Sequence, residues 1–327
     1  MPFRSLRMPK QLSHFACVLL GVVIGTGTGC EPSPSETSKA TLKVAVSILP
    51  QAYFVERIGG PHVEPHVLVG PGQSHGTYDP TPGQLIELSR CSLFFRIGVA
   101  IEDRLLKKLA ETHPKLEIVD TREGIKLRHM AGETHAHDDH GCTGTHDPHI
   151  WLDPMLVKVQ TQTICEALKR ADPNHADDYD RNLSAFHADL DNVHRRISEL
   201  LAPLTGKEFF VFHPAFGYFA DAYGLTQVAI ETAGKEAGPR QLVRLIDHAQ
   251  KTGVRLIFVQ KQFASNSAKA VAEAIGGSVV PIDPLERHYL RNLEDLAAEI
   301  ARSLERQPSL SQVANRDKRK LKSEPRP

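Results

Sequence analysis

The most informative residues of this chain are histidines gathered in one short stretch. Six of them fall within 21 residues, at His129, His135, His137, His140, His146 and His149. Neutral imidazole is the commonest side-chain ligand for zinc and related ions. The segment between them is polar, so we expect a solvated loop, 129–146, whose histidines are auxiliary metal ligands. A polar loop without a metal role is one alternative. A purification tag is another, although tags are unbroken runs at chain ends.

Four residues, three of them outside that stretch, follow the ends of predicted strands. They are His75, His149, His213 and Asp283. Ligands of parallel α/β sheets bind beyond the carboxyl ends of the strands. A single histidine in such a place is more often a hydrogen-bonded structural residue, and Asp283-Pro284 alone is an ordinary turn. The four together predict a site, because three imidazoles and one carboxylate form a closed tetrahedral shell that suits zinc.

The elements that would position these residues alternate between strand and helix. The first series has strands at 42–48, 63–69, 93–97 and 116–120, and helices at 51–58, 81–90 and 102–111. The second has strands at 208–212, 227–230, 256–259 and 279–282, and helices at 215–223, 239–251, 267–275 and 293–304. This alternation predicts an α/β fold with two similar lobes, each a parallel sheet flanked by helices.

One long helix is predicted between the two series. Apolar residues from Tyr179 to Leu200 step by 4, 3, 4, 3, 4 and 3, which places them on one helix face. A helix over 173–201 would be about 43 Å long. We favour a rigid helix that packs against both lobes of a monomer. A coiled-coil dimer is the alternative, although the stripe covers only about four heptads.

The N-terminus is typical of a targeting segment. Basic residues Arg4, Arg7 and Lys10 precede an apolar run over 15–24. This run is shorter than the roughly 20 residues of a membrane-spanning helix, so we predict a signal peptide. The tetrapeptide Gly-Thr-Gly-Cys that ends at Cys30 resembles the lipobox of bacterial lipoproteins, except that its first residue is usually aliphatic. The resemblance implies lipidation of Cys30 and attachment to a lipid bilayer. Secretion without a lipid is the alternative.

The remaining composition bounds the organisation of the chain. Lys and Arg number 39, as do Asp and Glu, so the formal net charge of zero argues against nucleic acid as a partner. Besides Cys30, the mature chain would hold Cys91, Cys142 and Cys165, an odd number that implies no full disulfide framework. We expect a signal peptide (1–29), a tether (30–40), a first lobe (41–171), a linking helix (172–203), a second lobe (204–305) and a basic disordered tail (306–327).

Four segments of this chain resemble motifs of one known family, the ZnuA/TroA-like metal-binding lipoproteins of ABC importers (cluster A-I). They are Tyr-Asp-Pro-Thr-Pro (78–82), Asp-Pro-His-Ile-Trp-Leu-Asp-Pro (147–154), Val-Phe-His-Pro-Ala-Phe-Gly-Tyr-Phe (211–219) and Gly-Gly-Ser-Val-Val-Pro-Ile-Asp-Pro-Leu (276–285). The resemblance covers about 41–305. It implies two lobes with a metal ion between them and delivery of that ion to an ABC permease.

At two positions the ligands that the resemblance implies have to be compared with the residues of this chain. The family usually has Pro-His-x-Tyr at its first ligand, whereas here His75-Gly76-Thr77-Tyr78 puts the histidine one residue early. Such a shift moves an imidazole by about 3.5 Å, which a glycine-flanked loop could restore. At the third ligand, manganese-type members carry Glu, and this chain carries His213. Imidazole in place of a hard oxygen favours zinc.

The function expected from these features is capture of Zn²⁺ outside the cytoplasm by a lipid-anchored protein of the periplasm or cell surface. A manganese or iron importer component and a metal-dependent adhesin are alternatives. A zinc hydrolase is a further one, but the sequence holds neither a His-Glu-x-x-His helix nor a nucleophile elbow. We therefore expect no enzymatic activity.

Overall fold

The computed structural model describes residues 41–130, 146–231, 237–263 and 266–305. All of them belong to the unit that begins at Thr41. The predicted signal peptide, tether and tail, together with Cys30 and Cys142, lie outside the described residues. Within the described part, no helix combines the length and apolar character needed to cross a membrane.

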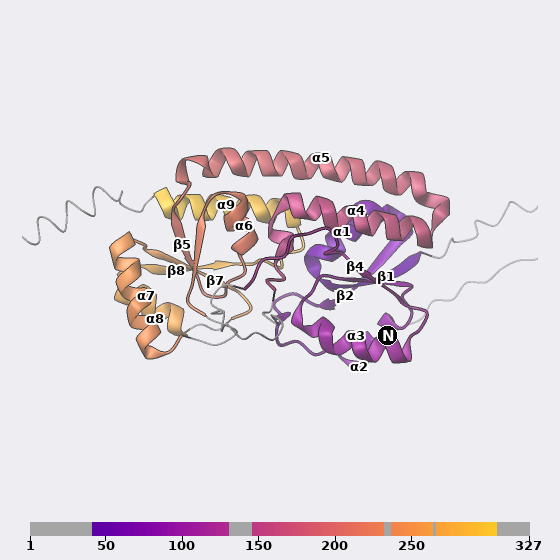
Figure 1. Cartoon of the computed structure of the whole chain (residues 1–327), viewed down its shortest axis with the longest axis horizontal. Coiled ribbons are helices and arrows are strands. Elements are labelled where there is room, and N and C mark those ends of the chain that lie inside the picture. The colour runs from indigo at the N-terminus through magenta and orange to yellow at the C-terminus, as the bar shows by residue number, and fades with distance from the viewer. Residues whose placement is uncertain (1–40, 131–145, 232–236, 264–265, 306–327) are drawn as a thin grey trace, which may run out of the picture. The chain divides into compact units, whose positions relative to one another are not determined.

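The first lobe is built on a four-stranded parallel sheet. Its elements are β1 (Leu42–Ile48), α1 (Leu49–Gly59), β2 (Val63–Val69), α2 (Pro82–Leu88), β3 (Leu93–Arg96), α3 (Ala100–Thr112) and β4 (Glu117–Asp120). The strand order is β2-β1-β3-β4. Helix α3 lies on one side of the sheet, and α1 and α4 (Pro154–Ala171) lie on the other (Figure 1). Covered on both faces, β1 is buried without interruption from Val44 to Ile48, and only Ser47 of these residues is polar.

The second lobe repeats this plan. Its elements are β5 (Glu208–Val211), α6 (Gly217–Ala222), β6 (Thr226–Ala229), α7 (Pro239–Thr252), β7 (Leu256–Gln260), α8 (Asn266–Ala274), β8 (Ser278–Ile282) and α9 (Tyr289–Glu305). Its strand order, β6-β5-β7-β8, matches that of the first lobe, and all pairs are parallel. The predicted α/β fold with two similar lobes is confirmed. In each sheet the second strand lies on one side of the first strand, and the third strand lies on the other side. The point at which the strand order changes direction in this way is where α/β sheets bind ligands.

The long helix between the lobes is α5 (Ala176–Leu201). Its apolar stripe is buried within the chain, against α1 and α4 of the first lobe and α9 of the second (Figure 1). The stripe therefore has no free face for a coiled-coil partner. One residue that we expected in this buried stripe is wrong. Leu200 is 41% exposed and Leu201 is fully buried instead, because a helix of 3.6 residues per turn drifts from a strict 3.5-residue repeat.

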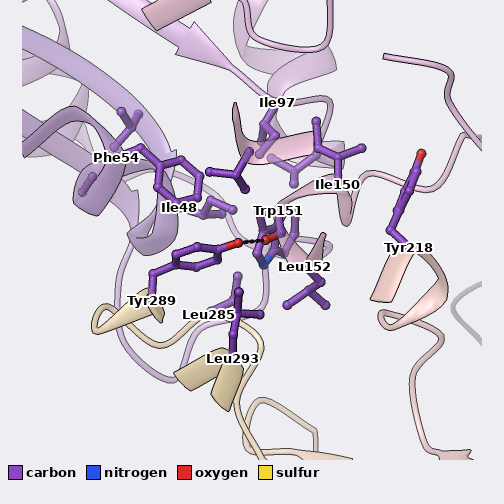
Figure 2. Close-up of a cluster of buried hydrophobic side chains, with 14 of the residues drawn as sticks. Ile48, Phe54, Ile97, Ile150, Trp151, Leu152, Tyr218, Leu285, Tyr289 and Leu293 are labelled. Atoms are coloured by element: carbon purple, nitrogen blue, oxygen red, sulfur yellow. Dashed lines mark hydrogen bonds between the residues drawn. The ribbon is translucent and has the colours of Figure 1, made fainter. Parts of the chain in front are cut away.

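The lobes share one hydrophobic core around Trp151, which lies in the short 3₁₀ turn η2 (Ile150–Leu152). The Trp151 indole N–H donates a hydrogen bond of 2.8 Å to the carbonyl oxygen of Pro284. The Tyr289 hydroxyl donates one of 2.7 Å to the Trp151 carbonyl, as Figure 2 shows. Phe54 of α1 packs edge-on against Tyr289, with ring centroids 4.8 Å apart. Side chains of each lobe thus pack against the other lobe and donate hydrogen bonds to its backbone, which resists hinge motion between them.

Truncation inside this shared core should be costly. Phe186 of α5 is fully buried beside Tyr53 and Phe54, so we expect Phe186→Ala to lower the free energy of unfolding by about 3–5 kcal/mol. Leu200→Ala, on the exposed side of the same helix, should change it by less than about 1 kcal/mol. Urea denaturation of both variants checks this, and similar losses would contradict the buried stripe.

Candidate metal centre

Three histidines from separate loops meet between the two sheets. His75 lies in the loop between β2 and α2, His149 directly precedes η2, and His213 follows β5. Each offers one ring nitrogen, and these three nitrogens all lie within 4.8 Å of one another. The ring centroid of His149 is 5.1 Å from that of His75 and 5.3 Å from that of His213. His75 reaches the cluster despite its one-residue offset.

The facing nitrogens have no hydrogen-bond partner. Nδ1 of His75 and Nε2 of both His149 and His213 are buried and unpaired. A buried polar atom without a partner is unfavourable by about 1–3 kcal/mol, so three of them side by side are typical of a binding site for a ligand. The group that three imidazole lone pairs fit is a cation of borderline softness. A cavity of about 10 Å³ lies among the three rings, which is space for one ion or water molecule.

Two carboxylates contact the ring nitrogens of His149 and His213 that face away from the cluster. The Nδ1 atom of His149 is 2.7 Å from Oδ1 of Asp147, and the Nδ1 atom of His213 is 3.1 Å from Oε2 of Glu231. An ionised carboxylate only accepts hydrogen bonds, so each Nδ1 must carry the proton. Each Nε2 therefore presents its lone pair to the cluster, which is the tautomer that binds a metal ion.

The backbone of His213 is also clamped. Gln260, fully buried at the end of β7, accepts a hydrogen bond of 3.2 Å from the His213 N–H and donates one of 2.7 Å to the His213 carbonyl oxygen. Phe263 stacks on the His213 ring, with centroids 4.9 Å apart. The second lobe thus fixes both the position and the plane of this imidazole.

Sequence reasoning missed the roles of Glu231 and Gln260. Glu231 directly follows the predicted strand 227–230, and Gln260 follows 256–259, so both stand at strand ends like the predicted site residues. That position was the available signal. Asp147 was part of the quoted motif without an assigned role.

Asp283 is not among the residues whose ligand atoms converge in the described part of the chain. Its Oδ1 atom accepts hydrogen bonds from Gln262 Nε2, at 2.7 Å, and from the Leu285 N–H, at 2.9 Å. These bonds shape the turn after β8, next to the cavity wall that Pro284 and Leu285 form. The carboxylate expected to be a fourth ligand therefore serves a turn in this structure.

Of the auxiliary histidines, only the two at the ends of the loop are described. His129 and His146 form an isolated antiparallel bridge, and their rings stack with centroids 5.4 Å apart. The Asp147 N–H donates a hydrogen bond of 2.9 Å to the Arg128 carbonyl oxygen. These contacts close the neck of the loop beside His149. His135, His137 and His140 lie outside the described residues.

The described cysteines take no part in the cluster. Cys91 and Cys165 are free and buried, as expected of core residues. Burial raises the pKa of the Cys91 thiol to about 11 and that of the Cys165 thiol to about 12. Both are therefore protonated at neutral pH and unsuited to metal binding.

Burial also keeps His75 and His149 neutral. It lowers the pKa of His75 well below its ordinary value, and the neighbouring rings of His149 and His213 lower it further. Burial likewise lowers the pKa of His149 and outweighs the opposing effect of Asp147. At neutral pH these imidazoles therefore carry no charge, which is the form that coordinates metal.

Comparisons with known proteins agree with this geometry. The family described as ZnuA, zinc-uptake complex component A, periplasmic, matches residues 44–303. A solved structure of ZnuA is 37% identical, with a TM-score of 0.75 over 81% of this chain and 100% of that one. A zinc-bound ZnuA with residues 138–173 deleted is also 37% identical, with a TM-score of 0.76 over 82% and 100%. The high-affinity zinc uptake system protein ZnuA of Bacillus subtilis is 26% identical over 83% of this chain and 86% of its own.

Metal-free protein should lose stability in mild acid. The unfolded chain takes up protons at His75 and His149 near pH 6.5, whereas the folded chain, with lowered pKa values, does not. The free energy of unfolding therefore falls as the pH drops below about 6.5, by up to about 1.4 kcal/mol per pH unit and group. His75→Gln should reduce the fall between pH 7.5 and 5.5 in urea denaturation. Equal falls in variant and parent would contradict this.

Proposed function

The chain belongs to the ZnuA family of periplasmic zinc-uptake components, and on that premise we propose that it captures Zn²⁺ outside the cytoplasm and delivers it to an ABC permease. The bound ion is cargo, so the protein performs no chemistry on it. The observation that carries the proposal is the convergence of three buried, unpaired imidazole nitrogens. An all-nitrogen set favours Zn²⁺ over Mn²⁺, which prefers oxygen ligands.

We assign His75, His149 and His213 as the three ligands. The fourth position of a tetrahedral ion would be filled by water or by Asp283. Oδ1 of Asp283 accepts hydrogen bonds from Gln262 and from the Leu285 N–H, so ligation through this atom requires it to give up these bonds. Such an exchange is local, because Pro284 and Leu285 already line the cavity.

The proposed location follows from the N-terminal sequence and from the family. We propose that residues 1–29 are removed as a signal peptide, that Cys30 carries lipid, and that 30–40 tether a monomer to the membrane surface. The tether would keep the metal centre near a permease in the same membrane. A periplasmic family supports the extracytoplasmic part of this proposal.

Zinc should stabilise the folded chain because its ligands come from both lobes. At 100 times the dissociation constant, a ligand adds about 2.7 kcal/mol, so the melting temperature should rise clearly with Zn²⁺ and little with Mg²⁺. His149→Ala and His213→Ala should each abolish most of the rise. His248→Ala is a matched control in the second lobe, because His248 pairs with Glu208 and is not part of the cluster. Equal responses to both ions would refute the assignment. Asp283→Asn tests the fourth position. Weaker zinc binding in this variant would assign Asp283 as a ligand, and unchanged binding would leave it a turn residue only.

The His-rich loop should be an auxiliary collector rather than part of the tight site. Its proposed ligands beyond the neck, His135, His137 and His140, would have to be ordered by each captured ion, so these sites should be weaker. Replacing 133–145 by a Gly/Ser linker of equal length should lower the zinc stoichiometry toward one and leave the tightest dissociation constant nearly unchanged. Calorimetry measures both. Loss of the tight site would instead assign a primary ligand to the loop.

A further inference from the structure

We propose that Asp147 and Glu231, neither of which is a metal ligand, set the affinity of the centre by orienting His149 and His213 and by balancing the charge of the ion. The inference rests on the proposed function, in which the three histidines bind Zn²⁺. It assigns a positioning role to one carboxylate on the first-lobe side of the centre and to one on the second-lobe side.

Asp147 is held rigidly where it meets His149. It is 1% exposed, and its Oδ1 atom accepts hydrogen bonds both from the His149 ring and, at 3.0 Å, from the His149 N–H. Its carbonyl oxygen accepts a bond of 3.1 Å from the Tyr218 hydroxyl of α6. Helix α6 can approach because residue 217 is glycine: a Cβ atom there would lie 2.8 Å from Oδ2 of Asp147 and 1.8 Å from Arg128. The carboxylate therefore has one orientation, and the imidazole follows it.

Glu231 is held by the end of the second sheet. Its N–H donates a hydrogen bond of 2.9 Å to the Phe212 carbonyl oxygen, so it sits beside the residue that precedes His213. Its side chain is 5% exposed, and its Oε2 atom meets Nδ1 of His213. This contact places a buried carboxylate directly beside the His213 ring.

The need for these carboxylates is electrostatic. Three neutral imidazoles bring no charge to a divalent ion, and the converging ligand atoms include no carboxylate in the described residues. Burying an uncompensated double charge is strongly unfavourable. Asp147 and Glu231 place two negative charges one hydrogen bond away from the ligands. A carboxylate behind a ligating imidazole also makes the ring more basic, and losing such a group usually weakens metal binding 10–100-fold.

The two carboxylates differ in their other neighbours. Arg128 Nε is 3.9 Å from Oδ2 of Asp147, so a cation already offsets part of this charge. For Glu231, the described residues give no ion pair other than that with His213. Among the described residues, the uncompensated charge at the centre is therefore mainly that of Glu231. We infer that removing the charge of Glu231 weakens metal binding more than removing that of Asp147.

Amide substitutions separate charge from orientation. In Glu231→Gln, the amide oxygen can still accept the His213 N–H, but the negative charge is gone, whereas Glu231→Ala removes both. Zn²⁺ dissociation constants, measured by competition with a chelating dye, should rise about 10–100-fold in Glu231→Gln, further in Glu231→Ala and less in Asp147→Asn. Glu208→Gln is the matched control, because it removes the carboxylate of a His–Glu pair outside the cluster, and it should leave the constant unchanged.

Two further readouts separate positioning from general structure. The melting temperature of metal-free Glu231→Gln should not fall, because no lysine or arginine of the described residues pairs with the buried Glu231 carboxylate before metal binds. The absorption spectrum of bound Co²⁺ should shift in Glu231→Gln and Glu231→Ala and remain unchanged in Glu208→Gln. Should Glu231→Gln fail to fold, Glu231→Asp, which keeps the charge and withdraws the carboxylate, should give intermediate binding, and wild-type affinity would overturn the proposal.

The outcomes distinguish this inference from the function on which it rests. If the unaltered chain binds no Zn²⁺, the proposed function fails and this inference fails with it. If the unaltered chain binds Zn²⁺ tightly and Glu231→Gln binds equally well, the inference alone is overturned.

Discussion

Three imidazole nitrogens that face one small cavity are the constraint on which this structure depends. Nδ1 of His75 and Nε2 of His149 and His213 are buried and have no hydrogen-bond partner among the described residues. Such an arrangement survives only if the surrounding structure is stiff enough to prevent the rings from turning toward other partners. The fold can therefore be understood as the framework that keeps these atoms together while they are unpaired.

The two lobes are held rigidly together by helix packing and by hydrogen bonds that run from one lobe to the other. Helix α5 buries its apolar stripe against helices of both lobes. Trp151 donates a hydrogen bond to the Pro284 carbonyl oxygen, and Tyr289 donates one to the Trp151 carbonyl oxygen. Trp151 is only two residues from His149, and Pro284 and Leu285 line the cavity. The same short segments thus join the lobes and shape the site. This construction opposes a swing of the two lobes away from each other.

Much of this arrangement is encoded locally and could be predicted. Apolar strands that alternate with amphipathic helices specify the two sheets, and strand ends specify where His75, His149 and His213 lie. Glu231 could not be assigned, because its contact with His213 joins residues 18 positions apart and depends on β6 lying beside β5. Asp283 shows the opposite case. Its position at the end of β8 suits a ligand, but Gln262 and the Leu285 N–H compete for its carboxylate. Leu200 and Leu201 differ only in helical phase, which a heptad count does not resolve.

The bridge between His129 and His146 has a consequence for how such a protein can evolve. The chain enters and leaves the loop through one closed pair of residues, and the bond between Asp147 and Arg128 seals the pair on the side of the metal centre. These contacts hold the two flanking strands of chain together beside His149. A change of length or composition between them therefore need not change the distance between the flanks, which leaves natural selection free to adapt the segment to the metal supply of each habitat. The same closed pair marks a natural position at which to graft a foreign peptide.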